Sequence, residues 1–324
     1  MMEINPAKLQ EEIDAFKRGV YNKNSNIFNV KTTIKALKVH APNENVGLEN
    51  IHPAVRLAYL DAKRTMSQID NKNRDYALAQ IETVLHDYFN PNNSAPSSKE
   101  KFDNKHKELC EIWCNCFRGS NIGTFGKAQK IVNMSFKYLF CCKDAADYKA
   151  YFKYCHMPLD SFTLEWFKRD VTIKKWFKNE VKENKKPRLI IGKMASWSAL
   201  GYDAEDDPQN AMGYYTTNGK KNYYSYLFYL ENIRTFIEAN GFRHSEEPKE
   251  LLSPLELEFV VWSETQKKQA AEDFLSGLEE DLYLHGNLSK DKYKLRKKSI
   301  ITSSLKENYD RISEILKSQG IGCK

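Results

Sequence analysis

Apolar residues recur every three or four positions in one segment of this chain after another. In residues 53–69 they include Val55, Ala58 and Ala62, and residues 77–88 repeat the pattern. This period is that of an α-helix with one buried face, whereas a half-buried strand alternates. The 324 residues contain only 14 Gly and 10 Pro, too few for the dense turns of an all-β protein. The sequence predicts an all-α or nearly all-α fold, built as a multi-helix bundle.

Start and stop signals place further helices along the chain. We expect helices at 6–19, 99–117, 126–142, 161–180, 223–239 and 299–317. Ser253-Pro254-Leu255-Glu256 matches a capping box and favours a helix, although residues 255–261 also alternate like a strand. Residues 188–191 are a short apolar run that fits a strand or a buried helix. One or two short strands, at residues 188–191 or 255–261, are therefore an alternative to helix.

A domain boundary is expected within residues 90–98. Residues 90–98 contain two prolines and no apolar anchor, which is typical of an exposed loop. We therefore predict an N-terminal helical unit at 1–90, a linker or exposed loop at 91–98, and a larger helical domain at 99–324.

Composition predicts a soluble cytoplasmic protein. Hydrophobic residues make up 41% of the chain, enough for a large core, so disorder is excluded as its main state. No run approaches the roughly 20 apolar residues that span a bilayer, and the first residues lack the pattern of a secretion signal. Seven cysteines, an odd number, favour free thiols in a reducing compartment. We expect no membrane partner; the sequence does not indicate an oligomeric state.

The positive charge of the chain is concentrated in residues 168–193. This segment holds ten cationic residues against three carboxylates, a net charge of +7, and the whole chain also carries +7. Such a segment attracts a polyanion, and Trp176 offers a ring for base stacking, with Trp166 and Phe167 just upstream. The predicted polyanion-binding residues are Lys168, Arg169, Lys174, Lys175, Trp176, Lys178, Lys182, Lys185, Lys186 and Arg188. The plainer alternative is a solvated helix face.

A second candidate site lies on the helix that begins near Gly126. A phosphate loop would need glycine at Asn121 and a hydroxyl residue at Ala128, so the sequence disfavours this class of nucleotide hydrolase. At 100° per residue, one face of the helix is apolar and the opposite face is polar. We expect Lys127, Gln129, Lys130, Asn133, Lys137 and the nearby His156 to line a cleft that favours an anion. The alternative is a satisfied polar seam between helices.

This segment also carries a resemblance. The run Gly-x-Ala-Gln-Lys-x-x-Asn-x-x-x-Lys-Tyr-Leu at 126–139, followed by His156-x-Pro158-x-Asp160, resembles a pattern in helical proteins of bacteria and their phages that have no assigned activity. The resemblance covers about residues 126–162 and transfers no catalytic residue. It implies a link to phages or mobile elements, where both nucleic-acid binding and inhibition of host proteins occur.

Tyrosines form a third candidate site. Tyr214, Tyr215, Tyr223 and Tyr224 lie close together in the sequence, around Asn218-Gly219. Tyrosine provides large amphipathic contact area at low entropic cost, so the cluster suits protein recognition as well as base stacking. Burial in the core is the alternative, above all for the neighbouring Tyr226 and Tyr229.

Metal binding and catalysis have weaker signals. His106, Cys110 and Cys114 are spaced four apart, but the sequence lacks the tight ligand pairs of a zinc site, so we predict no metal and no cofactor. Glu183, Lys185 and the acidic residues at 203–207 resemble nuclease elements only by short matches. We predict no catalytic residue.

Together these features favour a non-enzymatic intracellular protein that holds a polyanion, nucleic acid first, on a basic aromatic surface. The alternative is a protein-interaction module, encoded by a phage or mobile element, that inhibits a host or defence enzyme. Weaker alternatives are an enzyme acting on a phosphorylated small molecule and a metal-dependent nuclease.

Overall fold

The computed structural model describes residues 6–23, 30, 47–169, 196–202, 214–217, 220–223, 225–244, 250–263 and 265. The chain divides into two compact units, Met1–Val260 and Val261–Lys324. Nearly all described residues belong to the first unit. Residues 91–98 connect two helices inside that unit and contain no helix or strand of their own.

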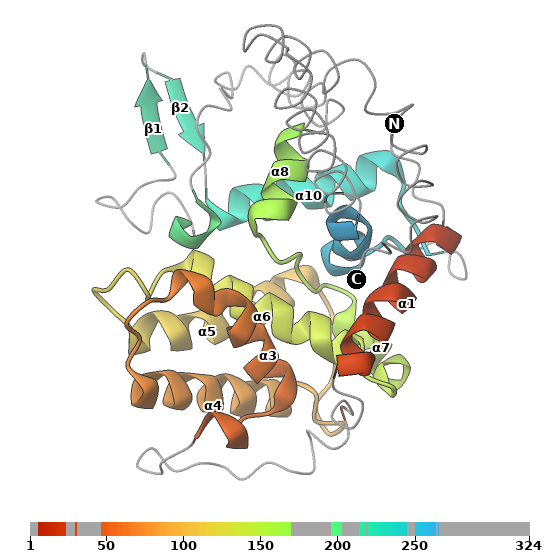
Figure 1. Cartoon of the computed structure of the whole chain (residues 1–324). Helices are drawn as coiled ribbons and strands as arrows, with labels where there is room; N and C mark the ends of the chain where they lie inside the picture. Colours follow the sequence, from red (N-terminus) through yellow and green to blue (C-terminus); the bar gives the residue numbers. More distant parts are fainter. Residues whose placement is uncertain are drawn as a thin grey trace, which may run out of the picture. The chain divides into compact units, whose positions relative to one another are not determined.

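Helices make up most of the described residues. In chain order the elements are α1 (Pro6–Lys23), η1 (Leu48–Asn50), α3 (Pro53–Ala62), η2 (Lys63–Thr65), α4 (Asn71–Tyr88), α5 (Lys99–Cys116), α6 (Phe125–Phe140), η3 (Ala145–Tyr148), α7 (Lys149–Phe152), α8 (Ser161–Arg169), η4 (Trp197–Ala199), β1 (Tyr214–Thr217), β2 (Lys220–Tyr223) and α10 (Tyr226–Asn240). Residues 254–263 are also helical. Within the described residues, the fold is therefore all-α apart from the small β1–β2 hairpin and one isolated bridge (Figure 1).

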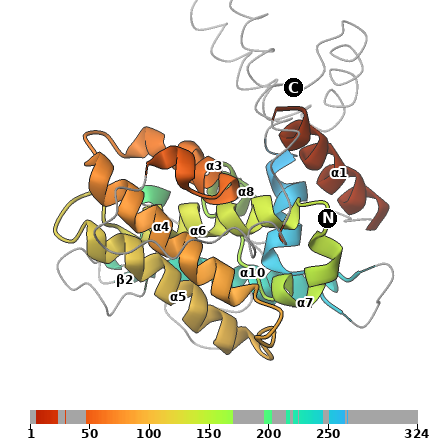
Figure 2. The same ribbon diagram turned by 90° about the horizontal axis from the view of Figure 1, so that it is seen from below.

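Helix α6 is buried along its length, from Phe125 to Leu139. Helices α3 and α5 pack against it, and α4 packs against α5 (Figures 1 and 2). Helix α3 brings Ala54, Ala58 and Ala62 to this interface region at four-residue spacing, all fully buried. Such small side chains let two helices approach closely, which explains the extensive contact between α3 and α6.

Side-chain caps fix where several helices begin. Asp70 accepts a hydrogen bond from the backbone N–H of Asn73 at 2.7 Å, at the start of α4. Ser98 and Thr124 act in the same way at the starts of α5 and α6. These caps satisfy N–H groups that the first turn of a helix leaves free. The starts of these helices are therefore encoded locally in the sequence.

The alternative of a strand at 255–261 is wrong. The amide and hydroxyl of Ser253 both donate to the Glu256 carboxylate, at 2.8 and 2.9 Å, and the N–H of Glu256 lies 3.3 Å from the hydroxyl. This reciprocal capping box starts the helix at 254–263. The apolar alternation arises because this helix is buried on most sides.

Other predicted boundaries shift by several residues. Helix α10 begins at Tyr226 rather than Tyr223, because Tyr223 belongs to β2. The helix expected at 53–69 ends at Ala62 and continues only as the short η2. Residues 188–191 and 299–317 lie outside the described residues. None of the described helices combines the length and apolar character needed to cross a lipid bilayer.

Gly126 lies where the backbone around η4 comes closest to α6. Its N–H donates to the carbonyl of Leu200 at 2.8 Å, and the Thr124 hydroxyl donates to the carbonyl of Ser198 at 2.6 Å. A Cβ atom at position 126 would lie 2.0 Å from the carbonyl oxygen of Trp197. Glycine is therefore required for residues 197–200 to dock on α6.

We expect Gly126→Ala to loosen this docking. The added methyl group meets backbone atoms that cannot rotate away, and overpacking of this kind costs about 1–3 kcal/mol. Hydrogen exchange measured by mass spectrometry should show faster exchange in peptides that cover residues 196–202. Asn104→Ala, at an exposed position of α5, is the control. Unchanged exchange at 196–202 in the glycine variant would contradict the interpretation.

Candidate functional site

The polar strip predicted on α6 is buried. The exposed fraction is 0% for Gln129 and Asn133, 1% for Lys137 and 8% for Lys130. Leaving a buried polar group without a hydrogen bond costs about 1–3 kcal/mol, and a buried charge costs more. Each of these side chains therefore depends on partners from other parts of the chain.

The lysines of the strip are paired inside the protein. Lys130 forms an ion pair of 2.5 Å with Asp160, and Lys137 pairs with Glu258. The ammonium of Lys127 donates to the carbonyl of Asn121. Their positive charge is thus compensated locally instead of facing an open cleft.

Gln129 binds the peptide backbone at Leu159. Its side-chain amide donates to the Leu159 carbonyl at 2.7 Å, and its carbonyl accepts the Leu159 N–H at 3.1 Å. Asn133 adds a hydrogen bond of 3.2 Å to the carbonyl of Met157. The run at 126–139 and the His156-x-Pro158-x-Asp160 segment, which carry the resemblance described above, therefore form one interlocked unit.

A chain of buried hydrogen bonds continues from Asn133 to the surface of α10. The Asn133 carbonyl can only accept, so His106 Nε2 donates to it at 2.8 Å. The Asn133 amide lies 3.0 Å from the Tyr226 hydroxyl, which lies 2.8 Å from His156 Nδ1. His156 Nε2 donates to Asp103 at 2.7 Å, because a carboxylate only accepts. The hydroxyl of Tyr226 must then donate to His156.

Arg234 closes this chain. Its two terminal nitrogens contact the two oxygens of Asp103 at 2.9 and 2.6 Å, and one of them also reaches Glu231 at 2.7 Å. The donors and acceptors from His106 to Asp103 can be assigned in one consistent direction. One terminal nitrogen of Arg234 also lies 3.2 Å from His156 Nε2, and both atoms are donors in this assignment. A connected network of this kind rigidifies a core and positions its members.

Both histidines of the network are neutral at pH 7. Burial lowers the pKa of His156 to about 4, although the hydrogen bond to Asp103 acts in the opposite direction. Burial lowers the pKa of His106 well below its usual value. Burial alone would raise the pKa of Asp103, but His156 and Arg234 hold it below its usual range. The network therefore contains one ionised acid, one guanidinium and two neutral imidazoles.

The described thiols are protonated at neutral pH. Burial raises the pKa of Cys114 and Cys141 to about 12, and it raises the pKa of Cys110, Cys116, Cys142 and Cys155 as well. A thiol that is not ionised is a poor nucleophile and metal ligand. Among the described residues, no group of three His, Cys, Asp or Glu side chains is arranged to hold a metal ion.

Most of the predicted polyanion surface lies outside the described residues. Lys168 and Arg169 are the last two residues of α8, and the described structure covers only the backbone of these two residues. Lys174, Lys175, Trp176, Lys178, Lys182, Lys185, Lys186 and Arg188 are outside the described ranges. Trp166 and Phe167 belong to the core and not to a stacking surface, because their rings pack on Phe236 and Tyr229, with centroids 5.6 and 5.1 Å apart.

The predicted tyrosine site falls partly on the hairpin. Tyr214 and Tyr215 are in β1 and Tyr223 is in β2, where the register pairs Tyr214 with Tyr223. Tyr224 lies outside the described residues. Tyr226 and Tyr229 are buried in the core, as the alternative reading of the cluster predicted.

Sequence reasoning did not find Asp103, Glu258 or Arg234. Nothing in the apolar period of their helices distinguishes these three residues from other charged residues. Their partners are also distant in the sequence, since Asp103 and Arg234 are 131 residues apart. The only signal was Asp103 three residues before His106 on one helical face.

The comparisons with known proteins add nothing to this geometry. No protein-family model, no curated protein and no solved structure matches the chain.

Proposed function

We propose that this chain is a non-enzymatic binding protein that holds a polyanion, with nucleic acid as the leading candidate, on the basic segment 168–193. The observation that carries the proposal is the charge distribution: this segment accounts for a net charge equal to the +7 of the whole chain. A polyanion such as nucleic acid is attracted to such a segment, because binding releases the counterions that are condensed on the polyanion.

The anchoring of the segment supports the proposal. On its N-terminal side, Trp166 and Phe167 of α8 are buried against α10. On its C-terminal side, the N–H of Gly126 donates to the carbonyl of Leu200, just after η4. The described residues on both sides of the basic segment therefore belong to the core.

The chemistry of the described core supports a binding role over catalysis. The buried imidazoles are neutral and already hydrogen-bonded, and the buried lysines already have acidic partners. Neither kind of group is placed to exchange protons with a substrate at neutral pH.

We expect fluorescence anisotropy to detect binding of a labelled single-stranded oligonucleotide, with an affinity that falls steeply as salt rises. The variant Lys174→Gln, Lys175→Gln, Lys178→Gln should reduce the slope of log affinity against log salt by about 2, because each lost contact to a single strand contributes about 0.7. The control replaces Lys63, Lys72 and Lys101, three exposed lysines of other elements, with glutamine.

The control has lost the same formal charge, so it separates local contacts from the charge of the whole molecule. Equal slopes in the two triple variants would mean that segment 168–193 is not the binding surface. Absence of binding at low ionic strength would remove the proposal altogether.

A docking function for the hairpin is the second candidate. The register of β1 and β2 pairs Tyr214 with Tyr223, so two tyrosines share one position on a small two-stranded ribbon. Tyrosine is favoured in protein interfaces. In a pull-down from a nuclease-treated bacterial lysate, a stoichiometric protein partner lost in Tyr214→Ser, Tyr223→Ser would favour docking over polyanion binding.

A further inference from the structure

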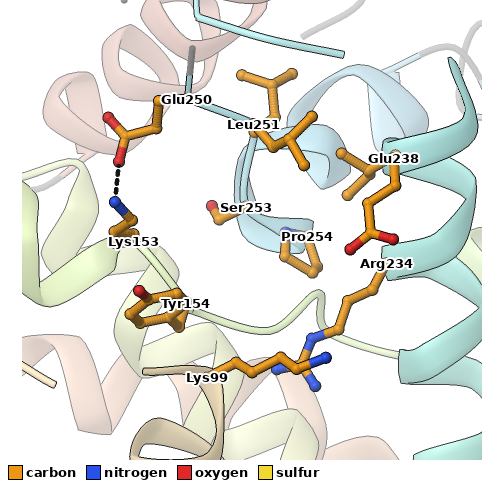
Figure 3. Close-up of a pocket in the computed structure, with 11 residues that line it drawn as sticks. Lys99, Lys153, Tyr154, Arg234, Glu238, Glu250, Leu251, Ser253 and Pro254 are labelled. Carbon is orange, nitrogen blue, oxygen red and sulfur yellow. Dashed lines mark ion pairs between the residues drawn. The ribbon is translucent and has the colours of Figure 1, made fainter. Parts of the chain in front are cut away.

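A pocket of about 280 Å³ opens between four segments of the first unit (Figure 3). The segments are the start of α5, the turn after α7, the middle of α10 and residues 250–254. Ile237, Leu251, Leu252 and Pro254 form its apolar wall, and Tyr154 adds an aromatic ring. Five charged side chains also line it: Lys99, Lys153, Arg234, Glu238 and Glu250.

Three of these charges are already compensated. Lys153 and Glu250 form an ion pair of 2.7 Å at one end of the pocket, and Lys149 reaches the same carboxylate at 3.8 Å (Figure 3). Arg234 is held by Asp103 and Glu231 in the network described above. Its guanidinium is therefore a fixed part of the wall.

The helix that starts at Pro254 offers little to a ligand. Pro254 has no N–H, the N–H of Leu255 donates to the carbonyl of Cys155 at 3.1 Å, and that of Glu256 is capped by Ser253. The backbone donors at this helix start are thus in use.

Of the five charged side chains that line the pocket, Lys99 and Glu238 have not yet been accounted for. Both are exposed, and neither has an ion-pair partner within the described part of the chain. Lys99 is also placed against a local rule, because a cation in the first turn of a helix meets the positive end of the helix dipole. In Figure 3, Lys99 runs toward the side of the pocket formed by Arg234 and Glu238, away from the Lys153–Glu250 pair.

We propose that this pocket binds a small zwitterion with an apolar side chain, of the hydrophobic α-amino acid class. The carboxylate lies against Lys99 and the Arg234 wall, the ammonium lies against Glu238, and the side chain covers Ile237, Leu251 and Leu252. The match is one of charge and polarity: beside an apolar wall, the pocket has one charge of each sign that forms no ion pair across it, and this ligand class has the same three features.

The test is a ligand-observed NMR titration of the full chain with three probes at low ionic strength. The probes are L-phenylalanine, 3-phenylpropanoate, which lacks the ammonium, and phenethylamine, which lacks the carboxylate. We expect phenylalanine to bind about fivefold or more tightly than either analogue, since each lost charge leaves one pocket charge without a partner.

Two variants assign the contacts. Lys99→Gln should weaken phenylalanine to about the level of phenethylamine while leaving phenethylamine unchanged. Glu238→Gln should weaken phenylalanine to about the level of 3-phenylpropanoate and leave that probe unchanged. Both side chains are exposed, so neither change threatens the fold, and circular dichroism checks this.

Lys101→Gln and Glu11→Gln, exposed positions outside the pocket, are the matched controls. Equal binding by Lys99→Gln and Lys101→Gln, equal binding of all three probes, or no saturable binding would each overturn the proposal. The triple lysine variant of segment 168–193 should bind phenylalanine like the unmodified chain, so this result is independent of the polyanion proposal.

Discussion

Replacing Lys137 with methionine is expected to lower the free energy of unfolding by about 3–5 kcal/mol at neutral pH. Lys137 and Glu258 form an ion pair in which each side chain has an exposed fraction of 1%. The ammonium of Lys137 also lies over the rings of Phe16 and Phe259, 4.1 and 4.7 Å from their centroids. Methionine fills a similar volume and packs well on aromatic rings, so the main loss is the counter-charge of Glu258.

The loss should depend on pH. Burial raises the pKa of Glu258, while Lys137 acts in the opposite direction, so removing Lys137 raises that pKa further. A carboxyl whose pKa is raised in the folded state binds its proton more tightly there than in the unfolded chain. Stability then falls as pH rises above the unfolded value of about 4.5. The deficit of the variant should be smallest near pH 4.5 and grow toward neutral pH.

A second substitution provides the control. Lys137→Met combined with Glu258→Met removes both charges and should recover most of the lost stability, because a buried ion pair is often replaced by apolar groups at little cost. Urea denaturation at pH 5 and pH 7.5 measures all three proteins. If the single variant loses less than about 1 kcal/mol at pH 7.5, or the double variant is the less stable of the two, Glu258 does not depend on Lys137.

The helices of this fold are largely readable from the sequence because their signals are local. The caps at Asp70, Ser98 and Thr124 and the capping box at Ser253 each lie within three residues of the group that they bind. The period of apolar residues then gives the buried face. The all-α class follows from these local features.

The hairpin was missed although a signal was present. Asn218-Gly219 lies between the paired residues Thr217 and Lys220, and a two-residue Asn-Gly loop is a strong hairpin signal. The expectations of a tyrosine cluster and of a helix from Tyr223 rest on side-chain type and apolar period and do not use this turn signal. The two turn residues determine the local structure here, because their backbone preference favours a hairpin over a helix.

The burial of the polar strip on α6 could not be predicted from local sequence signals. Period alone shows that Gln129, Lys130 and Asn133 share a face, but not whether that face meets water. The groups that cover it, Asp160 and Tyr226, come from 30 and 93 residues away. Contacts of that range depend on how helices are arranged, which no local signal encodes.

Asn133 is where the second large effect is expected, because four polar groups depend on it. Its carbonyl accepts from His106 at 2.8 Å, and its amide faces Gln129, Met157 and Tyr226 at 3.0 to 3.2 Å. Alanine at this position removes the 2.8 Å acceptor of the His106 N–H, for which only the Tyr226 hydroxyl at 3.4 Å is left, and it opens a void. One orphaned buried group costs about 1–3 kcal/mol, so we expect Asn133→Ala to lower the free energy of unfolding by about 3 kcal/mol or more.

The same network explains how the effect should spread. The Tyr226 hydroxyl loses the hydrogen bond from Asn133 but still donates to His156. The hydrogen bonds among His156, Asp103 and Arg234 should therefore persist, while the structure around His106 loosens. Amide exchange should therefore increase in the middle of α5 and α6 more than in α10, and urea denaturation gives the total loss. Asn104→Ala, an exposed asparagine two residues before His106, should change neither measurement. Equal stability of the two alanine variants would show that Asn133 is not a structural centre of this core.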